Sequence, residues 1–300
     1  MSTTALIAID WGTTSARAYR LDRAGQVLDQ RSGPYGISQI SDGRFAEALQ
    51  ALLGDWVADP APRIACGMIG SRQGWREAPY VQCPASLDAL AGGLVEVEGL
   101  HIAPGLVTRD GRGTPDVLRG EETQLLGAIA PDEPRVVAVL PGTHSKWAIV
   151  ERGTVVDFQT FLTGELYAVL LGHSILGRMV ERSPDQPPRA AFDRGLAHGL
   201  ESSGLTHDLF AARTLALTGE LEPAEIEPWL SGLLIGCEIR DASRWSKLRD
   251  SGASIRVIGA PALCQRYIDA IHIAGLQAEP GPTDAAAHGL WRIASERLLR

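Results

Sequence analysis

The stretch with the clearest chemical potential lies early in the chain, where an apolar run ends in a carboxylate and a turn of small, hydroxyl-bearing residues. It reads Leu6-Ile7-Ala8-Ile9-Asp10-Trp11, followed by Gly12-Thr13-Thr14-Ser15. Glycine lets a backbone approach a ligand closely, and successive N–H groups of a turn form a concavity that binds anions. A carboxylate beside a phosphate requires a hard cation, because Mg²⁺ binds carboxylate and phosphate oxygens together. Asp10 therefore predicts a metal-assisted phosphate site; the alternative is a β-hairpin whose polar residues only satisfy the turn.

A second strand, turn and strand of the same kind follows in the middle of the chain. The apolar run 136–140 leads into Pro141-Gly142-Thr143-His144-Ser145-Lys146, and a second apolar run continues from Trp147. The two matched copies indicate a duplicated domain rather than a short-period repeat. Thr143, Ser145 and the Lys146 ammonium suit the outer phosphates of a nucleotide, and a chance hairpin is less favoured because the copies match.

Two adjacent acids between the two hairpins are candidates for a catalytic base. Glu121 and Glu122 follow Gly120 at the start of a segment with helical apolar spacing. Acids in a first helical turn complement the helix dipole, and this alone explains one of them. Because neighbouring helical residues point in different directions, the other is free to face a cleft and accept a proton.

Two further strands run into small-residue or polar loops, which is where ligands bind in α/β sheets. The strand 63–70 is followed by Ser71, Arg72, Gln73 and Trp75, which suit an acidic, hydroxylated small molecule. The alternative is a surface loop whose Trp75 packs on the core. The strand from Ser254 runs into Gly259-Ala260-Pro261 and a helix, a platform for a flat ring or a phosphate.

Composition excludes several classes of protein. The chain has 300 residues, 45% of them hydrophobic and 21% charged, enough for one or two well-buried cores. A formal net charge of −8 argues against a nucleic-acid partner. The four cysteines show neither zinc spacing nor a C-x-x-C pair, and no apolar run is long enough for a membrane span or an export signal. We expect a cytoplasmic protein with no membrane or nucleic-acid partner, and a homo-oligomer is a further expectation.

The remaining pattern predicts a mixed α/β chain in two domains, 1–130 and 131–300, divided at the acidic linker Pro131-Asp132-Glu133-Pro134. Apolar spacing predicts helices over 45–57, 194–201, 205–217, 228–245 and 263–274, and a final small-residue helix from Asp284, an expected N-cap. The polar, proline-rich stretch 180–192 is expected to be a flexible connection. Glu238 is expected to be a solvated or locally paired acid.

Five motifs together resemble the 2-dehydro-3-deoxygalactonokinase family, within the superfamily of actin, hexokinase and the heat-shock chaperone ATPases. They are Ile9-Asp10-Trp11-Gly12-Thr13-Thr14; Gly67-Met68-Ile69-Gly70-Ser71 with Gly74-Trp75 and Ala78-Pro79-Tyr80; Arg119-Gly120-Glu121-Glu122-Thr123-Gln124; Pro141-Gly142-Thr143-His144-Ser145-Lys146-Trp147; and Thr163-Gly164-Glu165-Leu166. The first is generic to the superfamily, whereas the third and fourth are specific. The resemblance covers nearly the full length.

The resemblance implies two ribonuclease-H-like domains of the actin-like ATPase fold flanking an active-site cleft, with ATP bound mainly by the second. It implies ATP-dependent phosphorylation of 2-dehydro-3-deoxy-D-galactonate at the 6-hydroxyl, in D-galactonate catabolism. The alternatives are a kinase for a related acid such as 2-dehydro-3-deoxygluconate, and a non-catalytic sugar sensor on the same fold.

The roles expected from this resemblance follow the motifs. Asp10 holds Mg²⁺, directly or through water. Either Glu121 or Glu122 is the base, with Glu121 favoured. The ATP-binding residues are Gly12, Thr13, Thr14, Ser15, Gly142, Thr143, Lys146, Gly259, Ala260 and Pro261. The substrate-binding residues are Arg17, Ser71, Arg72, Gln73, Trp75, Arg119, Thr163 and Glu165, of which Arg17, Arg72 and Arg119 are candidates to pair with the substrate carboxylate.

Overall fold

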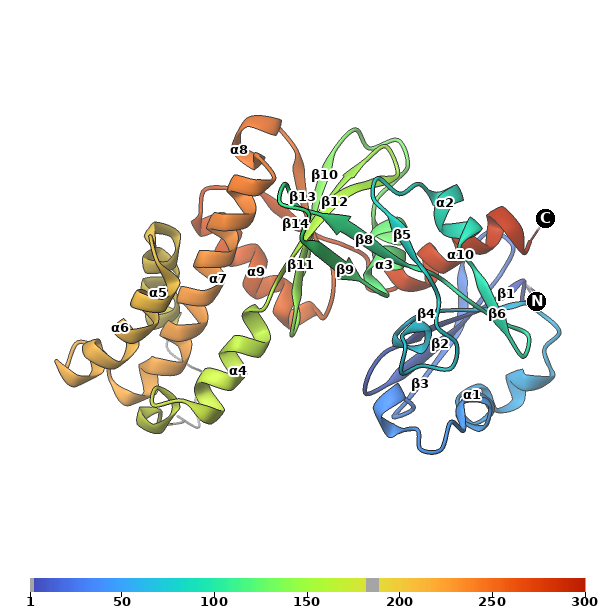
Figure 1. The fold of residues 1–300 in the computed structure, drawn as a ribbon, viewed down its shortest axis with the longest axis horizontal. Coiled ribbons are helices and arrows are strands. Elements are labelled where there is room, and N and C mark those ends of the chain that lie inside the picture. Colours follow the sequence, from blue (N-terminus) through green and yellow to red (C-terminus); the bar gives the residue numbers. More distant parts are fainter. Residues whose placement is uncertain (1–2, 182–188, 300) are drawn as a thin grey trace. The chain divides into compact units, whose positions relative to one another are not determined.

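The computed structural model describes residues 3–181 and 189–299, and the chain divides into two compact units (Figure 1). Unit 1 comprises Met1–Val136, Ala148–Phe158 and Gly281–Arg300. Unit 2 comprises Val137–Trp147 and Gln159–Pro280. Relative to the predicted division between residues 130 and 131, Ala148–Phe158 and Gly281–Arg300 also belong to unit 1.

Unit 1 is built on a six-stranded sheet with the order β3-β2-β1-β4-β7-β6. Its strands are β1 (Leu6–Trp11), β2 (Ala16–Leu21), β3 (Val27–Gly33), β4 (Arg63–Gly67), β6 (Val95–Val97) and β7 (Leu100–Ile102). The first three strands form the expected antiparallel meander, and β4 pairs in parallel with both β1 and β7. Parallel pairing brings the carboxyl ends of β1 and β4 to the same edge of the sheet.

Apolar residues of β1 and of the first helix form the core of unit 1. In β1 only Asp10 is not buried, as expected for a central strand that delivers one polar side chain at its end. The predicted helix 45–57 is α1 (Phe45–Leu53) followed by the 3₁₀ turn η2 (Gly54–Ala58). The change occurs at Gly54, whose φ of 55° lies in the left-handed region and interrupts the α-helix.

Helices α3 (Glu121–Ala128) and α10 (Ala285–Arg297) pack against each other in unit 1 at close range. A Cβ at Gly289 would lie 1.8 Å from the Thr123 carbonyl oxygen, and one at Gly127 would lie 1.8 Å from that of Ala285. Only glycine permits this approach. Asp284 precedes α10 as the expected N-cap residue, but its carboxylate makes no capping hydrogen bond and lies 3.5 Å from His288 Nε2.

We expect Gly289→Ala to destabilise the protein, because the new methyl group overlaps the backbone of α3. Overpacking of this kind costs about 1–3 kcal/mol. Gly172→Ala is the matched control: this glycine lies in α4 (Thr163–His173) with nothing within 4 Å of the added Cβ, so alanine is expected to be neutral or stabilising by up to about 1 kcal/mol. Urea unfolding of both variants measures the difference, and equal stabilities would contradict the α3–α10 contact.

A small sheet completes unit 1. Strands β5 (Tyr80–Gln82), β8 (Gly105–Arg109) and β9 (Pro115–Leu118) lie in the order β5-β8-β9, with β5 parallel and β9 antiparallel to β8. Elsewhere in unit 1, the short helix α2 (Leu87–Gly92) lies between β5 and β6, and the 3₁₀ turns η1 (Ile37–Gln39) and η3 (Met68–Gly70) follow β3 and β4. Strand β9 ends two residues before Gly120, so the small sheet fixes the start of α3.

Unit 2 repeats the strand order of unit 1. Its sheet runs β12-β11-β10-β13-β14, which matches β3-β2-β1-β4-β7 position by position. The strands are β10 (Val136–Leu140), β11 (Ser145–Glu151), β12 (Thr154–Phe161), β13 (Ser254–Val257) and β14 (Ala278–Pro280), and residues 148–158 of β11 and β12 are grouped with unit 1. This order is the ribonuclease-H-like topology, so the expected fold class, α/β with a duplicated actin-like architecture, is confirmed.

The helices of unit 2 are α4, α5 (Arg189–Glu201), α6 (Leu205–Leu217), α7 (Ile226–Trp245), α8 (Leu248–Ser251) and α9 (Pro261–Ile273), with the 3₁₀ turns η4 (Gly177–Met179) and η5 (Pro223–Glu225). Four of these helices, α5, α6, α7 and α9, agree with the predicted ranges except at some ends. Helix α5 begins inside the stretch 180–192 that was expected to be a flexible connection, and residues 182–188 of that stretch lie outside the described residues. Close approach of α5 and α7 depends on glycine, because a Cβ at Gly195 would lie 2.0 Å from the Trp229 carbonyl oxygen.

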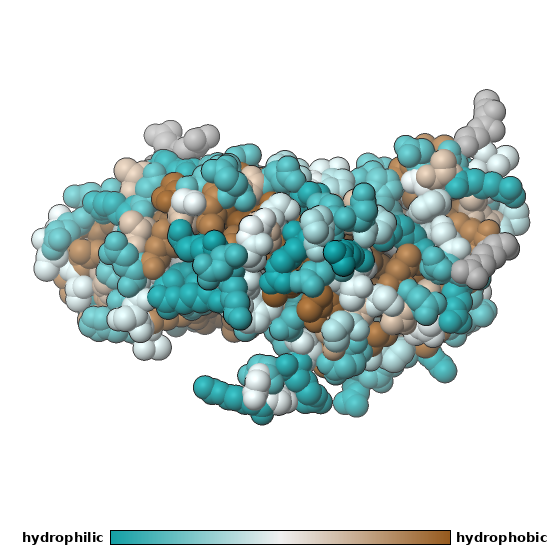
Figure 2. Space-filling model, turned by 90° about the horizontal axis from the view of Figure 1, so that it is seen from above, coloured by the Kyte–Doolittle hydropathy of each residue, from teal (hydrophilic) through white to brown (hydrophobic). Residues whose placement is uncertain are grey.

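The surface carries no single dominant apolar face in the view of Figure 2, where hydrophobic residues occur in groups among hydrophilic ones. All four cysteines are free thiols buried in the units. Among the described residues, no helix combines the length and the apolar character that crossing a membrane requires.

Candidate active site

Three acids of unit 1 surround one buried thiol where β1, β4 and α3 meet. Asp10 stands in register with Cys66 of the neighbouring β4, and the thiol donates to Asp10 Oδ1 over 3.9 Å. Burial raises the pKa of the Cys66 thiol well above its usual value, and the charges of Asp10, Glu122 and Glu121 raise it further. The structure thus brings together the strand acid and the helix acids that the sequence singled out separately.

Two glycines permit this convergence. Gly67 ends β4 with a φ of 89°, and a Cβ there would lie 2.7 Å from the Trp11 carbonyl oxygen. Gly120 precedes α3 with a φ of 106°, and its Cβ would lie 3.2 Å from the Gly67 Cα. Both positions therefore require a residue without a side chain, and the first turn of α3 comes to the end of β1 for that reason.

The two glutamates at the start of α3 have different surroundings. Glu121 Oε2 accepts a hydrogen bond from the Arg119 N–H (3.0 Å), and its side chain is only partly buried. Glu122 Oε2 accepts one from the Gly120 N–H (2.6 Å), and this residue is fully buried. Among the described residues nothing bonds to Glu122 Oε1. One carboxylate oxygen of each glutamate therefore accepts a backbone N–H at the start of α3. Of the two side chains, only that of Glu121 is accessible to solvent.

Burial raises the pKa of Glu122 from 4.5 to about 8, with a further contribution from the neighbouring Glu121. The folded protein then holds a proton at neutral pH that the unfolded chain has released. A carboxyl that is protonated at neutral pH is a poor general base, which favours Glu121 over Glu122 for that role.

The same shift predicts how stability depends on pH. Between pH 4.5 and about 8 the folded state binds one more proton than the unfolded state. The free energy of unfolding therefore falls as pH rises through this window, by about 1.4 kcal/mol per pH unit. Glu122→Gln should remove this slope. Urea unfolding at about pH 5.5 and about pH 8 should show wild type losing roughly 3 kcal/mol more than the variant. Glu96→Gln, at an exposed position on β6, controls for the loss of a carboxylate, and parallel profiles for wild type and Glu122→Gln would contradict the shift.

The loop after β4 presents two of its predicted residues to solvent and packs a third. Arg72 and Gln73 are exposed, and Ser71 is half-buried in the turn closed by the Gly74 N–H bond to its carbonyl oxygen (2.9 Å). Trp75 instead stacks on Phe45 at 6.2 Å between ring centroids and packs on the core of unit 1. For Trp75 the packing alternative explains the residue.

Arg119 connects the start of α3 to the small sheet. Its Nη2 donates to the Ala78 carbonyl oxygen (2.8 Å), and its guanidinium lies 4.3 Å from the centre of the Tyr80 ring. Nε and Nη1 are buried and have no hydrogen-bond partner among the described residues. Arg17, in register with Asp10 on β2, is exposed.

The first of the two predicted phosphate-binding turns keeps its hydroxyls exposed, while its carbonyl groups are hydrogen-bonded within unit 1. Gly12 N–H donates to the Ser15 carbonyl oxygen (3.0 Å). The Gly12 and Thr13 carbonyl oxygens accept from the N–H groups of Ile37 and Ser38, at 3.1 and 2.9 Å. The side chains of Thr13, Thr14 and Ser15 are exposed, so this turn has donors available for an anion.

The second turn, in unit 2, is braced by the start of α4. The Glu165 N–H donates to the Thr143 carbonyl oxygen (2.9 Å), and the Glu165 carboxylate bonds to His144 Nε2. Gly142 has open space around its missing Cβ and Thr143 is exposed. Lys146 is 7% exposed, and its ammonium donates to Thr160 Oγ1 (2.9 Å), so it lies inside unit 2 rather than in the exposed turn.

The buried carboxylate of Glu238, whose role was not predicted from the sequence, accepts hydrogen bonds from residues that follow this turn. Glu238 of α7 is 3% exposed, so of the two expected alternatives, a solvated or a locally paired acid, the solvated one is wrong. It accepts hydrogen bonds from Ser145 Oγ (2.6 Å), Trp147 Nε1 (2.7 Å) and Tyr267 OH (2.9 Å), and the Thr163 hydroxyl is a fourth partner. Burial raises its pKa while these donors lower it. The hydroxyl of Thr163, which was predicted to bind substrate, is thus hydrogen-bonded to Glu238 within unit 2.

The Gly259-Ala260-Pro261 turn lies beside the second turn. The Ile258 N–H donates to the Val139 carbonyl oxygen (2.8 Å). A Cβ at Gly259 would lie 3.8 Å from the Pro141 carbonyl oxygen. All three residues are exposed, and Pro261 occupies the first turn of the 13-residue helix α9. Two predicted nucleotide-binding segments are therefore adjacent in unit 2.

The donor set fits a magnesium ion that a nucleotide brings with it. Within residues 3–181 and 189–299, no three His, Cys, Asp or Glu side chains gather as a metal site. Mg²⁺ is commonly held by one or two carboxylates together with substrate phosphates and water, so the Asp10 carboxylate beside a turn with exposed hydroxyls fits such an ion.

Comparison with known proteins identifies the family. The family model for 2-keto-3-deoxy-galactonokinase matches residues 10–293. The chain belongs to this family. It is 35% identical over 274 residues to the 2-dehydro-3-deoxygalactonokinase of Escherichia coli (strain K12), covering 90% of each chain. A Rhizobium meliloti (strain 1021) protein assigned to the same activity is 36% identical over 303 residues, covering 95% of this chain and 97% of its own.

A crystal structure from Sinorhizobium meliloti, of a protein assigned as a 2-dehydro-3-deoxygalactonokinase, shares the fold. It has a TM-score of 0.86 and 35% identity, and it covers 98% of this chain and 99% of its own. Membership of the 2-keto-3-deoxy-galactonokinase family confirms the predicted resemblance and makes the chain a sugar-acid kinase with ATP as co-substrate. The two motifs described above as specific form the start of α3 and the second turn.

Proposed function

We propose that the protein transfers the terminal phosphoryl group of ATP to the 6-hydroxyl of 2-dehydro-3-deoxy-D-galactonate, and that it does so in the cytoplasm. The observation that carries the proposal is the convergence of Asp10 and Glu121 at the ends of β1 and β4, beside a turn with exposed hydroxyls. A carboxylate for a metal, a second carboxylate for a proton and donors for an anion are the parts that phosphoryl transfer requires.

Unit 1 supplies the groups for the acceptor and for the metal. Asp10 holds Mg²⁺, directly or through water, and the ion when bound neutralises charge on the phosphates. Glu121 accepts the proton of the attacking hydroxyl, because it is the partly exposed acid of the pair. Exposed Arg17 and Arg72 bind the substrate carboxylate, since guanidinium pairs with carboxylate in a bidentate manner.

Unit 2 supplies groups for the nucleotide. Backbone N–H groups of Gly142 and Thr143 bind phosphate oxygens, and the adjacent Gly259-Ala260-Pro261 turn receives the adenosine. Lys146 has no part in this proposal because its ammonium bonds to Thr160. In unit 1, Gly12 to Ser15 bind phosphate oxygens through N–H and hydroxyl groups.

A coupled ATP-consumption assay over a panel of 2-keto-3-deoxy sugar acids tests this function. We expect kcat/KM for 2-dehydro-3-deoxy-D-galactonate to exceed that for 2-dehydro-3-deoxygluconate by at least about tenfold, a difference of about 1.4 kcal/mol in transition-state binding. Omitting Mg²⁺ should abolish turnover. A higher kcat/KM for the gluconate-derived acid would assign the chain to that substrate instead.

A further inference from the structure

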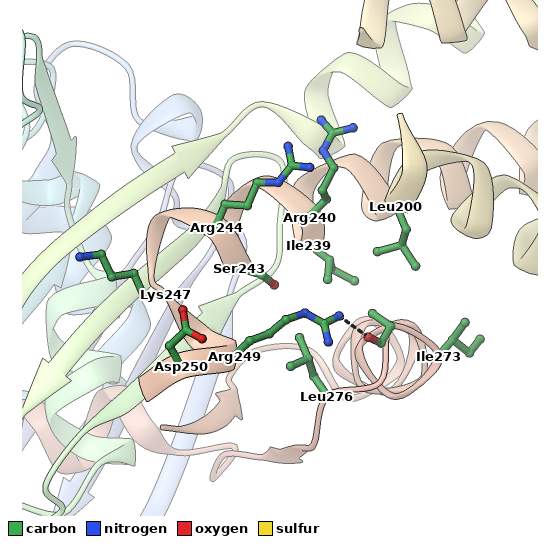
Figure 3. A pocket seen from close by; sticks show the side chains of 11 residues that line it. Leu200, Ile239, Arg240, Ser243, Arg244, Lys247, Arg249, Asp250, Ile273 and Leu276 are labelled. Atoms are coloured by element: carbon green, nitrogen blue, oxygen red, sulfur yellow. Dashed lines mark hydrogen bonds between the residues drawn. The ribbon is translucent and has the colours of Figure 1, made fainter. Parts of the chain in front are cut away.

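A cavity of about 570 Å³ lies in unit 2 between the end of α7, the short helix α8 and the end of α9 (Figure 3). Four cationic side chains line it, those of Arg240, Arg244, Lys247 and Arg249, with a single carboxylate, Asp250. Its remaining lining is largely apolar. This combination is unusual in a chain whose net charge is −8.

The cavity is separate from the proposed nucleotide turn. It contacts Ile273 and Ala274, at the C-terminal end of α9, whereas the Gly259-Ala260-Pro261 turn lies at the N-terminal end of the same helix. A 13-residue helix is roughly 20 Å long at 1.5 Å per residue. A ligand in the cavity therefore does not occupy the proposed ATP site.

Most of the positive charge around the cavity is not neutralised by the protein. Arg240 is paired with the Asp241 carboxylate through two bonds of 2.7 and 2.9 Å. Arg244 and Lys247, by contrast, make no ion pair or hydrogen bond with side chains of the described residues, and Arg249 Nη2 donates to the Ala274 carbonyl oxygen (2.9 Å). Arg244 and Lys247 are exposed at the rim of the cavity and are therefore available to an anionic ligand.

An unpartnered hydroxyl points into the same space. Ser243 Oγ is buried and has no hydrogen-bond partner among the described residues. Figure 3 shows it directed from α7 into the gap that the Arg249 side chain crosses. A buried polar group without a partner costs about 1–3 kcal/mol, so this oxygen indicates a polar ligand atom. Ile239 and Leu276 supply an apolar wall beside it.

We propose that this cavity binds a small organic phosphate. Arg249 contacts the phosphate, Ser243 donates to one of its oxygens, and the organic part lies against Ile239 and Leu276 (Figure 3). Arg244 and Lys247, whose charged ends point away from this gap, attract the anion from the rim of the cavity. Several separate cations favour a dianionic phosphate over a single carboxylate, because each phosphate oxygen accepts charge-assisted hydrogen bonds. This site is independent of the proposed kinase reaction and is suited to regulation by a phosphorylated metabolite.

Titration calorimetry with phenyl phosphate as the probe tests the proposal. We expect binding that persists in the presence of a saturating non-hydrolysable ATP analogue. The double variant Arg244→Glu, Lys247→Glu should weaken it by at least about tenfold, the equivalent of one charged hydrogen bond. Arg23→Glu reverses the charge of an exposed arginine of unit 1 that does not line the cavity, and it should leave the affinity unchanged. Basal kcat and KM for ATP should be the same in all three proteins.

Three results would overturn the proposal: no heat of binding with phenyl phosphate, equal affinity in the double variant and wild type, or complete displacement by the ATP analogue. Ser243→Ala provides a second route if the double variant does not fold, as judged by circular dichroism. It removes only the hydroxyl and should lower the affinity several-fold. Calorimetry does not depend on turnover, so failure here is distinguishable from failure of the proposed kinase function.

Discussion

Glu121→Gln is expected to lower kcat by about two to four orders of magnitude while leaving ATP affinity unchanged. Glutamine has the size of glutamate, and its amide oxygen is still able to accept the Arg119 N–H bond that holds the side chain at the start of α3. It is unable to accept the proton of the attacking hydroxyl. Steady-state kinetics with the galactonate-derived acid measure kcat, and nucleotide titration measures ATP affinity separately.

Glu122→Gln is the matched control for this experiment, because it makes the same change at the next residue. Glu122 is fully buried and has a pKa of about 8, so its replacement should alter the pH dependence of stability far more than kcat. Near-normal turnover of Glu121→Gln would refute its assignment as base. A large loss of kcat in Glu122→Gln alone would transfer the role to Glu122.

Asp10→Asn should raise the Mg²⁺ concentration needed for half-maximal rate by about 10–100-fold, and lower kcat by about 10²–10³-fold at saturating Mg²⁺. Burial raises the pKa of the Asp10 carboxyl, and a carboxylate removed from water has lost hydration that a bound cation replaces. The neutral amide keeps the shape of the side chain but contributes no charge to the metal. Rate measured against free Mg²⁺ at saturating ATP gives both quantities.

Asp29→Asn, at an exposed position on β3, controls for the loss of one negative charge and should leave the Mg²⁺ dependence unchanged. Thermal unfolding of both variants establishes that the fold is intact. If Asp10→Asn requires no more Mg²⁺ than wild type, Asp10 does not hold the metal.

Local pattern was sufficient to predict most of the secondary structure. The β1–β2–β3 meander follows from apolar runs separated by turn residues, and α6 was predicted over its full range of Leu205–Leu217. The position of α10 was not predictable from its own residues. Its small side chains indicate close packing, but the partner α3 lies about 160 positions earlier, and the contact of Gly289 with Thr123 appears only in the folded chain.

The candidate site was predictable where chemistry is carried by adjacent residues, as in the Asp10 turn and the glutamate pair. It was not predictable where burial decides the role. Glu121 and Glu122 are identical in type, and the register of α3 buries only the second of them. Lys146 and Ser145 are neighbours in one polar turn, yet both side chains turn inward, and Ser145 reaches Glu238 across 93 positions of sequence.

The return of α10 to unit 1 constrains how the protein is made. Residues up to 136 leave the ribosome first, but the helix that packs on α3 is translated only after all of unit 2. At about 5–20 residues per second, the nascent chain waits on the order of ten seconds between residue 158 and residue 281. During that time α3 lacks the close contact with α10 that Gly127 and Gly289 allow. Unit 1, whose first residues are synthesised before those of unit 2, is thus completed only after unit 2 has been made. It is the unit that a chaperone would need to protect.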